Sequence, residues 1–232
     1  MNNEAHDDKK SNDGASEKGP LSLFVVVCLA GMGFLSGAAL GQAIDIAYPM
    51  NGALDYYWPI WEVASLGIEV CWWIPILYGI AGAILVVGFP LFDRRTRQKP
   101  RGGFNPSWRF TFASIGVFVV FWWMGPYLHS LGVPNVGIFF FTVPTALLVW
   151  WVFDNTRGGL FMCLLTATIG PLIEITLING FNLYSYTTPD IFGIPLWILG
   201  AYLCGSPANG NLGRKYLAFL QRHLTKSKAP VK

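Results

Sequence analysis

The stretch VGIFFFTVPTALLVWWVFDNTRGG, residues 136–159, decides the fold class of this chain. No ionisable side chain occurs from Val136 to Phe153, and Asp154 and Arg157 then mark an abrupt return to polar sequence. An apolar run of this length is typical of a transmembrane helix, and a tryptophan pair near its polar end is typical of the membrane–water interface. The stretch therefore predicts a membrane-spanning helix that ends at Phe153.

The composition of the whole chain also indicates a membrane protein. Hydrophobic residues make up 53% of the 232 residues, charged residues make up 12%, and the mean hydropathy is +0.44. Soluble domains carry about a quarter charged residues, so a soluble globular fold is excluded. The last apolar segment is short and contains Pro195 and Gly200. We predict six spans, at residues 21–44, 70–92, 110–131, 136–153, 160–178 and 191–207.

The distribution of Lys and Arg predicts how these spans are oriented. All 16 Lys and Arg residues lie in the two tails, between the second and third spans, or in the turn after Phe153. Because Lys and Arg are enriched in cytosolic loops, we expect both termini in the cytosol. The predicted fold is therefore an all-α integral membrane bundle of six transmembrane helices over residues 21–207. A disordered cytosolic tail, 1–20, precedes it, and a basic cytosolic tail, 208–232, follows it.

Residues that usually carry catalysis or bind metals are sparse and scattered. The four cysteines have no metal-ligand spacing, and the sequence contains no glycine-rich phosphate loop and no G-x-S-x-G turn. Glycines are spread through the spans, as in GMGFLSGAALG (31–41), where small residues let helices approach closely. The net charge of +3 comes from the cytosolic loops and does not indicate a nucleic-acid surface. We expect no catalytic residue, no metal site, no cofactor and no nucleic-acid partner.

Glu174 is the one carboxylate that falls at membrane depth. A charge at that depth is costly and often functional, so Glu174 is either a ligand or proton contact or a hydrogen-bonded packing residue. His129 ends the third span at the interface, where a structural role is favoured. We expect no second carboxylate beside Glu174, which argues against a proton-coupled transporter.

The residues alone leave two interpretations of Trp150, Trp151 and Asp154 open. They can form an interfacial aromatic belt followed by a polar turn, or the tryptophans can line a lipid pocket while Asp154 contacts another protein. Asp154 follows Trp150 by four residues, so both lie on roughly the same helix face, with Asp154 expected in water. The helix dipole is negative at this end and disfavours a carboxylate, so helix stability gives little reason for Asp154.

Several motifs resemble the Insig (insulin-induced gene) family. They are WWVFDNTRGG (150–159), ING (178–180), YSYTTPD (184–190) and GNLGR (210–214). Upstream, CWWIPILYGIAGAILVVGFPLFD (71–93) resembles the second span of the family. Each motif alone is weak, but their ordered combination is specific. The six-span count and the cytosolic ends, reached without the resemblance, agree with it.

The resemblance implies a non-catalytic regulator of the endoplasmic-reticulum membrane, or of the plasma membrane in a prokaryote. Such a protein binds a sterol or a glycerolipid in its helix bundle. It also contacts other polytopic membrane proteins, namely Scap-like escorts of SREBP and HMG-CoA reductase, and is compatible with a homo-oligomer. The resemblance places Asp154 as the partner contact and Trp150 and Phe118 as sterol contacts. The full set of predicted lipid-binding residues is Trp72, Trp73, Phe118, Trp150, Trp151 and Glu174.

Two departures from the family bear on the ligand. Gly137 stands near the position of a glutamine that supports sterol recognition, and Glu174 stands where a glutamine is usual. The resemblance therefore leaves open other lipids, such as diacylglycerol. The competing function is an integral-membrane enzyme or transporter for isoprenoid or carotenoid lipids. That function needs paired carboxylates or a metal cluster at membrane depth, and the sequence offers Glu174 alone.

Overall fold

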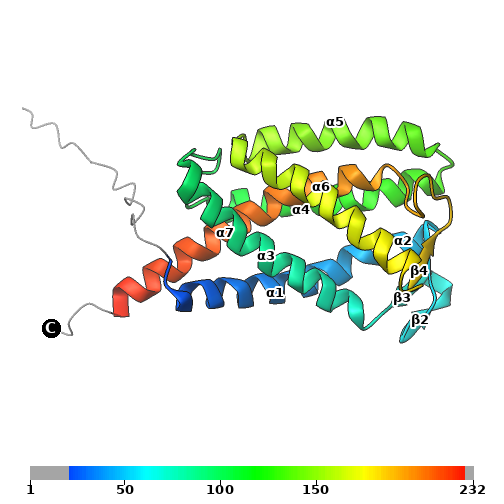
Figure 1. Cartoon of the computed structure of the whole chain (residues 1–232), viewed down its shortest axis with the longest axis horizontal. Helices are drawn as coiled ribbons and strands as arrows, with labels where there is room; N and C mark the ends of the chain where they lie inside the picture. The colour runs from blue at the N-terminus through cyan, green and yellow to red at the C-terminus, as the bar shows by residue number, and fades with distance from the viewer. Residues whose placement is uncertain (1–20, 228–232) are drawn as a thin grey trace, which may run out of the picture.

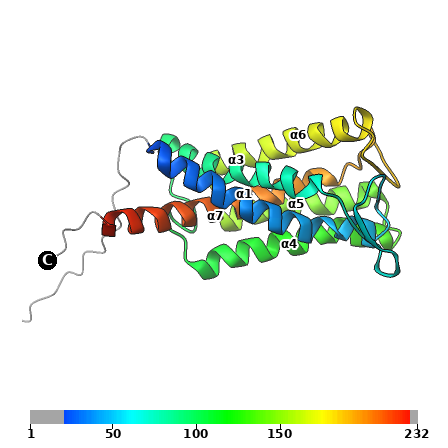
Figure 2. The same cartoon turned by 90° about the horizontal axis from the view of Figure 1, so that it is seen from below.

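Six long helices run side by side, and a small cap of short strands covers one end of the bundle (Figures 1 and 2). The computed structural model describes residues 21–227, so the tail 1–20, which we expected to be disordered, lies outside the described residues. The long helices are α1 (Leu23–Asp45), α3 (Trp73–Thr96), α4 (Trp108–Ser130), α5 (Asn135–Phe153), α6 (Arg157–Asn179) and α7 (Ile198–Ser227).

Five helical segments within the described residues are long and apolar enough to cross a membrane. They are α1 together with the short α2 (Ala47–Met50), then α3, α4, α5 and α6. Each coincides with one of the predicted spans to within a few residues. The expected class, a helical integral membrane bundle, is therefore confirmed, although the four short strands were not expected; the six-span count and the cytosolic ends stay predictions.

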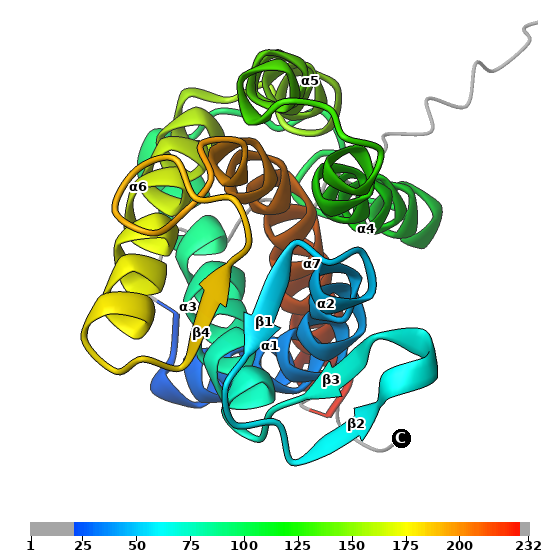
Figure 3. The same ribbon diagram turned by 90° about the vertical axis from the view of Figure 1, so that its right-hand side faces the viewer.

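The last helix differs most from the prediction. Helix α7 begins at Ile198 and continues to Ser227, well past residue 207, where we expected the bundle to end. Residues 210–215 are buried although they are largely polar, because α7 packs against α3, α4, α5 and α6 in the interior of the bundle (Figure 3). The boundary between bundle and basic tail at 207/208 was therefore wrong. Polar residues that resembled a cytosolic tail are satisfied inside the protein.

Glycines bring α1 and α3 into close contact, as the small residues of segment 31–41 predicted. A Cβ atom added at Gly37 would lie 2.4 Å from the carbonyl oxygen of Tyr78, and one at Gly82 would lie 2.5 Å from that of Gly33. These distances are shorter than any normal contact, so a larger residue would force the helices apart. Direct backbone contact of this kind is a common way for transmembrane helices to associate.

The cap contains the segment between α1 and α3 and the segment before α7. Strand β1 (Leu54–Tyr56) pairs antiparallel with β4 (Tyr184–Tyr186), with Leu54 opposite Tyr186. Strands β2 (Trp61–Val63) and β3 (Ile68–Val70) form a hairpin around the 3₁₀ turn η1 (Ala64–Leu66). The ring nitrogens of His129 lie 3.2 and 3.3 Å from the hydroxyls of Thr187 and Thr188, so this histidine joins α4 to the cap.

Candidate functional site

A cavity of about 260 Å³ lies within the half of the bundle that adjoins the cap. Helices α1, α2, α3, α4, α6 and α7 line it together with strands β1 and β4, and α5 contributes nothing. Its outer part is apolar and includes the exposed side chains of Ile80 and Ile84 on α3 and of Ile169 and Ile173 on α6. The cavity is therefore open between α3 and α6, on a surface that faces the membrane.

The inner part of the cavity is polar and contains two buried carboxylates. Glu174 on α6 accepts hydrogen bonds from the hydroxyls of Tyr186, at 2.6 Å, and Tyr202, at 2.5 Å. Asp45, at the end of α1, accepts hydrogen bonds from Tyr78, at 3.2 Å, and from Tyr56. The expectation that Glu174 has no second carboxylate beside it was therefore wrong.

The cap explains how Asp45 becomes part of this site. The chain turns back after α2, and strand β1 carries Tyr56 onto Asp45, while β4 carries Tyr186 onto Glu174. Burial, and secondarily the neighbouring Glu174, raise the pKa of Tyr186 well above its usual value. Its hydroxyl therefore stays protonated and remains a hydrogen-bond donor to the carboxylate. A usable sequence signal existed, because Asp45 directly follows the last apolar residue of the first predicted span.

Three further polar groups line the cavity without a hydrogen-bond partner among the described residues. They are the Tyr48 hydroxyl and the indole N–H groups of Trp73 and Trp122. An indole nitrogen can only donate, and leaving a buried donor unpaired costs about 1–3 kcal/mol. A ligand with hydroxyl, carbonyl or ether oxygens at this depth would satisfy them. The cavity thus combines an apolar outer part with a polar inner end in which these three groups have no partner among the described residues.

Half of the predicted lipid-binding residues meet in this cavity. Phe118, Trp73 and Glu174 all line it. Phe118 is buried and packs edge-to-face against Trp122, with ring centroids 5.5 Å apart. Trp73 stacks on Tyr184 at 5.9 Å. These three come from three different helices, α4, α3 and α6, and line the same cavity.

The other predicted lipid-binding residues lie elsewhere. The Trp72 side chain is 63% exposed and does not line the cavity. Trp150 and Trp151 belong to α5, away from the cavity. The Trp150 indole N–H, which we expected to be free for a ligand, donates to the carbonyl of Thr156 at 3.2 Å. Trp151 is half exposed, with the Arg101 guanidinium 5.1 Å from its ring centroid. Their geometry fits the interfacial-belt interpretation.

Asp154 is buried, which contradicts its predicted place in water. Its side chain is completely buried, and its Oδ2 atom lies 2.7 Å from Nη2 of Arg214. Its Oδ1 atom accepts hydrogen bonds from the backbone N–H of Thr156, at 3.0 Å, and from the Thr156 hydroxyl. The predicted neighbour Arg157 instead donates its backbone N–H to Gln98. The side chain of Asp154 therefore cannot be a solvated contact in this conformation.

Arg214 is bound between two carboxylates. Its Nε atom lies 2.6 Å from Oδ2 of Asp93, and its Nη2 donates to Oδ1 of Asp93 at 3.0 Å while also pairing with Asp154. We call Asp93, Asp154 and Arg214 the ionic cluster; all three side chains are at least 94% buried. The ends of the motifs VGFPLFD, WWVFD and GNLGR therefore meet in space. Sequence reasoning missed this because Arg214 was assigned to a solvated tail.

The fold and the site together define a class, namely a polytopic helical membrane protein with a cavity open to the membrane. The particular family follows from comparison with known proteins. The model of the INSIG family, described as insulin-induced protein, matches residues 62–217. The chain therefore belongs to the INSIG family, as the sequence motifs predicted.

Curated relatives and solved structures agree with this assignment. The insulin-induced gene 1 protein of Danio rerio is 29% identical over 155 residues, which is 66% of this chain and 59% of the relative. That of Xenopus laevis is 30% identical over the same proportions. The chain thus spans 59% of the length of these relatives.

Among solved structures, the Insig homologue of Mycobacterium vanbaalenii has a TM-score of 0.68 at 21% identity, covering 86% of this chain and 97% of that one. A cross-linked trimer of the mycobacterial homologue has a TM-score of 0.66 at 19% identity, covering 92% of this chain and all of that one. At this identity the likeness establishes the fold.

Proposed function

We propose that this chain is a non-catalytic membrane regulator that binds a sterol or a glycerolipid in the cavity between α3 and α6. The observation that carries the proposal is the polarity of the cavity, which is apolar where it opens to the membrane and polar at its closed end. An amphiphilic lipid is divided in the same way, into a polar head and an apolar body. Its oxygen atoms would accept hydrogen bonds from Tyr48, Trp73 and Trp122, and its apolar body would lie along Phe118 and the isoleucines of α3 and α6.

The size of the cavity limits how such a ligand would be held. A volume of about 260 Å³ is below the range of about 300–1,000 Å³ that is usual for enclosed ligand sites. A sterol or diacyl lipid would therefore place its polar end and the adjacent part of its body inside. The remainder would lie between α3 and α6 in contact with the surrounding lipid, so ligand binding would change the surface that these helices present to other membrane proteins.

Membership of the INSIG family supports the remaining parts of the proposal. The partners would be polytopic membrane proteins of the Scap and HMG-CoA-reductase type, and the location would be the endoplasmic-reticulum membrane, or the plasma membrane in a prokaryote. The cross-linked trimer of the mycobacterial homologue supports a homo-oligomer. The ligand would be the only bound small molecule, with no catalytic cofactor.

One observation favours a second candidate function. An integral-membrane enzyme or transporter acting on isoprenoid or carotenoid lipids needs paired carboxylates, and Asp45 and Glu174 line the same cavity. Each of them accepts two tyrosine hydroxyls, one on each oxygen, which holds the carboxylate in a fixed orientation. This arrangement favours a fixed recognition surface over a reacting pair, and we therefore keep the binding function as the first proposal.

Identification of the lipid that co-purifies with the protein tests the proposal. Wild-type protein purified in mild detergent should retain one sterol or glycerolipid, identified by mass spectrometry, without converting it during incubation. The Phe118→Ala variant should retain much less, whereas Phe140→Ala should retain the normal amount, because Phe140 is exposed on α5 and away from the cavity. Equal retention by the two variants would disprove the site, and turnover of the lipid would establish the enzyme.

A further inference from the structure

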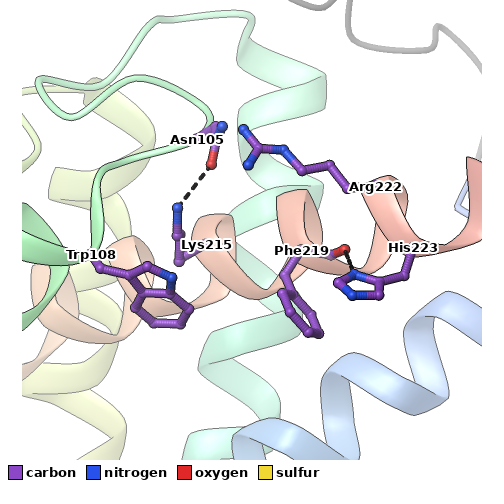
Figure 4. A pocket seen from close by; sticks show the side chains of 6 residues that line it. All are labelled: Asn105, Trp108, Lys215, Phe219, Arg222 and His223. Carbon is purple, nitrogen blue, oxygen red and sulfur yellow. Dashed lines mark hydrogen bonds between the residues drawn. The ribbon is translucent and has the colours of Figure 1, made fainter. Parts of the chain in front are cut away.

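A second hollow, of about 200 Å³, lies at the end of the bundle opposite the strand cap (Figure 4). It forms between the start of α4, with the loop before it, and the part of α7 that continues past residue 207. It shares no residue with the cavity between α3 and α6. Its lining consists of Asn105, Trp108, Lys215, Phe219, Arg222 and His223.

The sequence of α7 places four of these residues on one face. Lys215, Phe219, Arg222 and His223 follow one another at spacings of four, three and one, which is the periodicity of a helix surface. The face therefore carries two cations and a histidine around one aromatic ring. The aromatic rings of Phe219 and Trp108 are 43% and 41% exposed. Exposed aromatic rings beside basic side chains are typical of the level where lipid headgroups meet the apolar region.

The charge of this hollow is not balanced by the residues that line it. None of its six lining residues is acidic. The Lys215 Nζ atom donates to Oδ1 of Asn105 at 3.3 Å and lies 5.1 Å from the centroid of the Trp108 ring, and both contacts are with uncharged groups. The Arg222 guanidinium extends over the hollow toward Asn105 (Figure 4). Lys215 is nevertheless 92% buried, so its charge is held at a site where none of the lining residues is a counter-ion.

The hollow differs in this respect from the neighbouring ionic cluster. Arg214, adjacent in sequence to Lys215, pairs with Asp93 and Asp154 on the inner side of α7. Lys215 is rotated by about 100° from Arg214 on the same helix turn, and no acidic residue lines its hollow. A positively charged concavity with an amide and two aromatic rings is complementary to a phosphate group, because lysine acts as a point charge and arginine can bind two phosphate oxygens.

We propose that this hollow binds a phosphate group, carried by the headgroup of an anionic membrane lipid. Lys215 and Arg222 would contact the phosphate oxygens, His223 would add a donor, and Trp108 and Phe219 would pack on the lipid backbone. The aromatic residues favour a lipid phosphate over a free phosphate ion, since a small ion has no apolar part for them to cover. This site is separate from the lipid cavity of the proposed function and recognises different chemistry.

Binding of short-chain lipids to the purified full-length chain tests the proposal. The probes are dioctanoyl phosphatidic acid, dioctanoylglycerol, which lacks the phosphate, and inorganic phosphate, each titrated and followed by native mass spectrometry. Lys215 and Arg222 are both replaced by Gln in the test variant. In the matched control, Arg95 and Arg109 are replaced by Gln, which removes the same charge from exposed positions outside the hollow.

We expect the wild-type protein and the control to bind phosphatidic acid alike, and the test variant to bind it about tenfold more weakly. Binding should also weaken with added salt. Equal loss in both double variants would show only a diffuse basic surface and overturn the proposal. Competition by inorganic phosphate at the concentration of the lipid would overturn the lipid as the source.

Two further measurements keep the outcome decisive. Arg222 is exposed, so the single variant Arg222→Gln should fold normally and still bind phosphatidic acid more weakly than wild type. If the double variant does not fold, this single variant decides the outcome, and unchanged binding by it would contradict the proposal. Phe118→Ala should leave phosphatidic acid binding at this site unchanged, because it affects only the cavity. Failure of one site therefore does not imply failure of the other.

Discussion

The geometry of the ionic cluster predicts that the variant Arg214→Met is much less stable than the wild-type protein. Methionine keeps much of the length of the arginine side chain but removes its charge and all its donors. Asp93 and Asp154 would then remain as two buried carboxylates without a cation, since their present cation is Arg214. Removing one partner of a buried ion pair costs about 3–5 kcal/mol, because the remaining charge is left uncompensated. For a chain of this size we expect the midpoint of thermal unfolding to fall by roughly 6–20 °C.

A graded set of variants distinguishes this explanation from a general packing effect. Arg214→Lys keeps the charge but loses the fork that reaches both carboxylates, so its loss of stability should be smaller. Asp154→Asn should lower the free energy of unfolding by a smaller amount, about 1–3 kcal/mol. Arg214 would still be paired with Asp93, and the asparagine oxygen could still accept a hydrogen bond from Thr156. Arg157→Gln should change stability by no more than about 0.5 kcal/mol, because Arg157 is exposed.

Thermal unfolding of purified protein, followed by intrinsic tryptophan fluorescence, measures this series. The midpoint of thermal unfolding should fall most for Arg214→Met, less for Arg214→Lys and least for Asp154→Asn, and that of Arg157→Gln should stay close to wild type. If Asp154→Asn and Arg157→Gln both unfold with the wild-type midpoint, Asp154 does not stabilise the fold. Its role would then have to be sought at a surface exposed in another conformation. A wild-type midpoint of unfolding for Arg214→Met would show that the ionic cluster does not stabilise the fold.

Three other predictions concern packing, ligand and topology. Gly37→Leu should cost at least about 1–3 kcal/mol of stability, because it overfills the contact with α3, whereas Gly31→Ala, which meets nothing within 4 Å, should be tolerated in the same thermal unfolding assay. Phe118→Ala should weaken lipid binding by about 1–3 kcal/mol, and Trp150→Ala should leave it unchanged, as measured by mass spectrometry of retained lipid; the reverse result would place the ligand at α5. A cysteine at Phe104, which is 43% exposed, should label from the cytosolic side in a background without the native cysteines, and labelling from the lumenal side alone would disprove the orientation.

The apolar helices could be predicted because their signal is local. Between Val136 and Phe153 every side chain is uncharged, so the length and hydropathy of that run were sufficient to predict α5, and the same reasoning gave α1, α3, α4 and α6. The close approach of a helix to segment 31–41, which includes Gly37, was also predicted, since glycine has no side chain to keep backbones apart; the partner, Gly82 on α3, was not. Phe118, which the family resemblance predicted as a lipid contact, lines the cavity, and its contact with a lipid stays a prediction.

The polar parts of the structure could not be predicted in this way, because the burial of a charge depends on a partner far away in the sequence. Asp154 looked exposed since its nearest cation in sequence, Arg157, is exposed; its actual partner is Arg214. Asp45 looked like the first residue of a loop, and only the pairing of β1 with β4 brings tyrosines onto it and onto Glu174. In both cases the decisive contact is between elements that are distant along the chain.

Helix α7 connects these observations. Within one helix, Tyr202 contributes to the polar end of the cavity, Arg214 joins the ionic cluster, and Lys215 faces the basic hollow. Residues 210–215 of α7 are too polar to be recognised as part of a span, yet they are buried. The Asn211 amide donates to the carbonyl of Phe153, Arg214 pairs with Asp93 and Asp154, and Lys215 donates to Asn105. A shift of α7 would therefore alter the cavity and the hollow together, with the ionic cluster resisting it. The polarity that made this helix look like a tail is what fixes its position in the bundle.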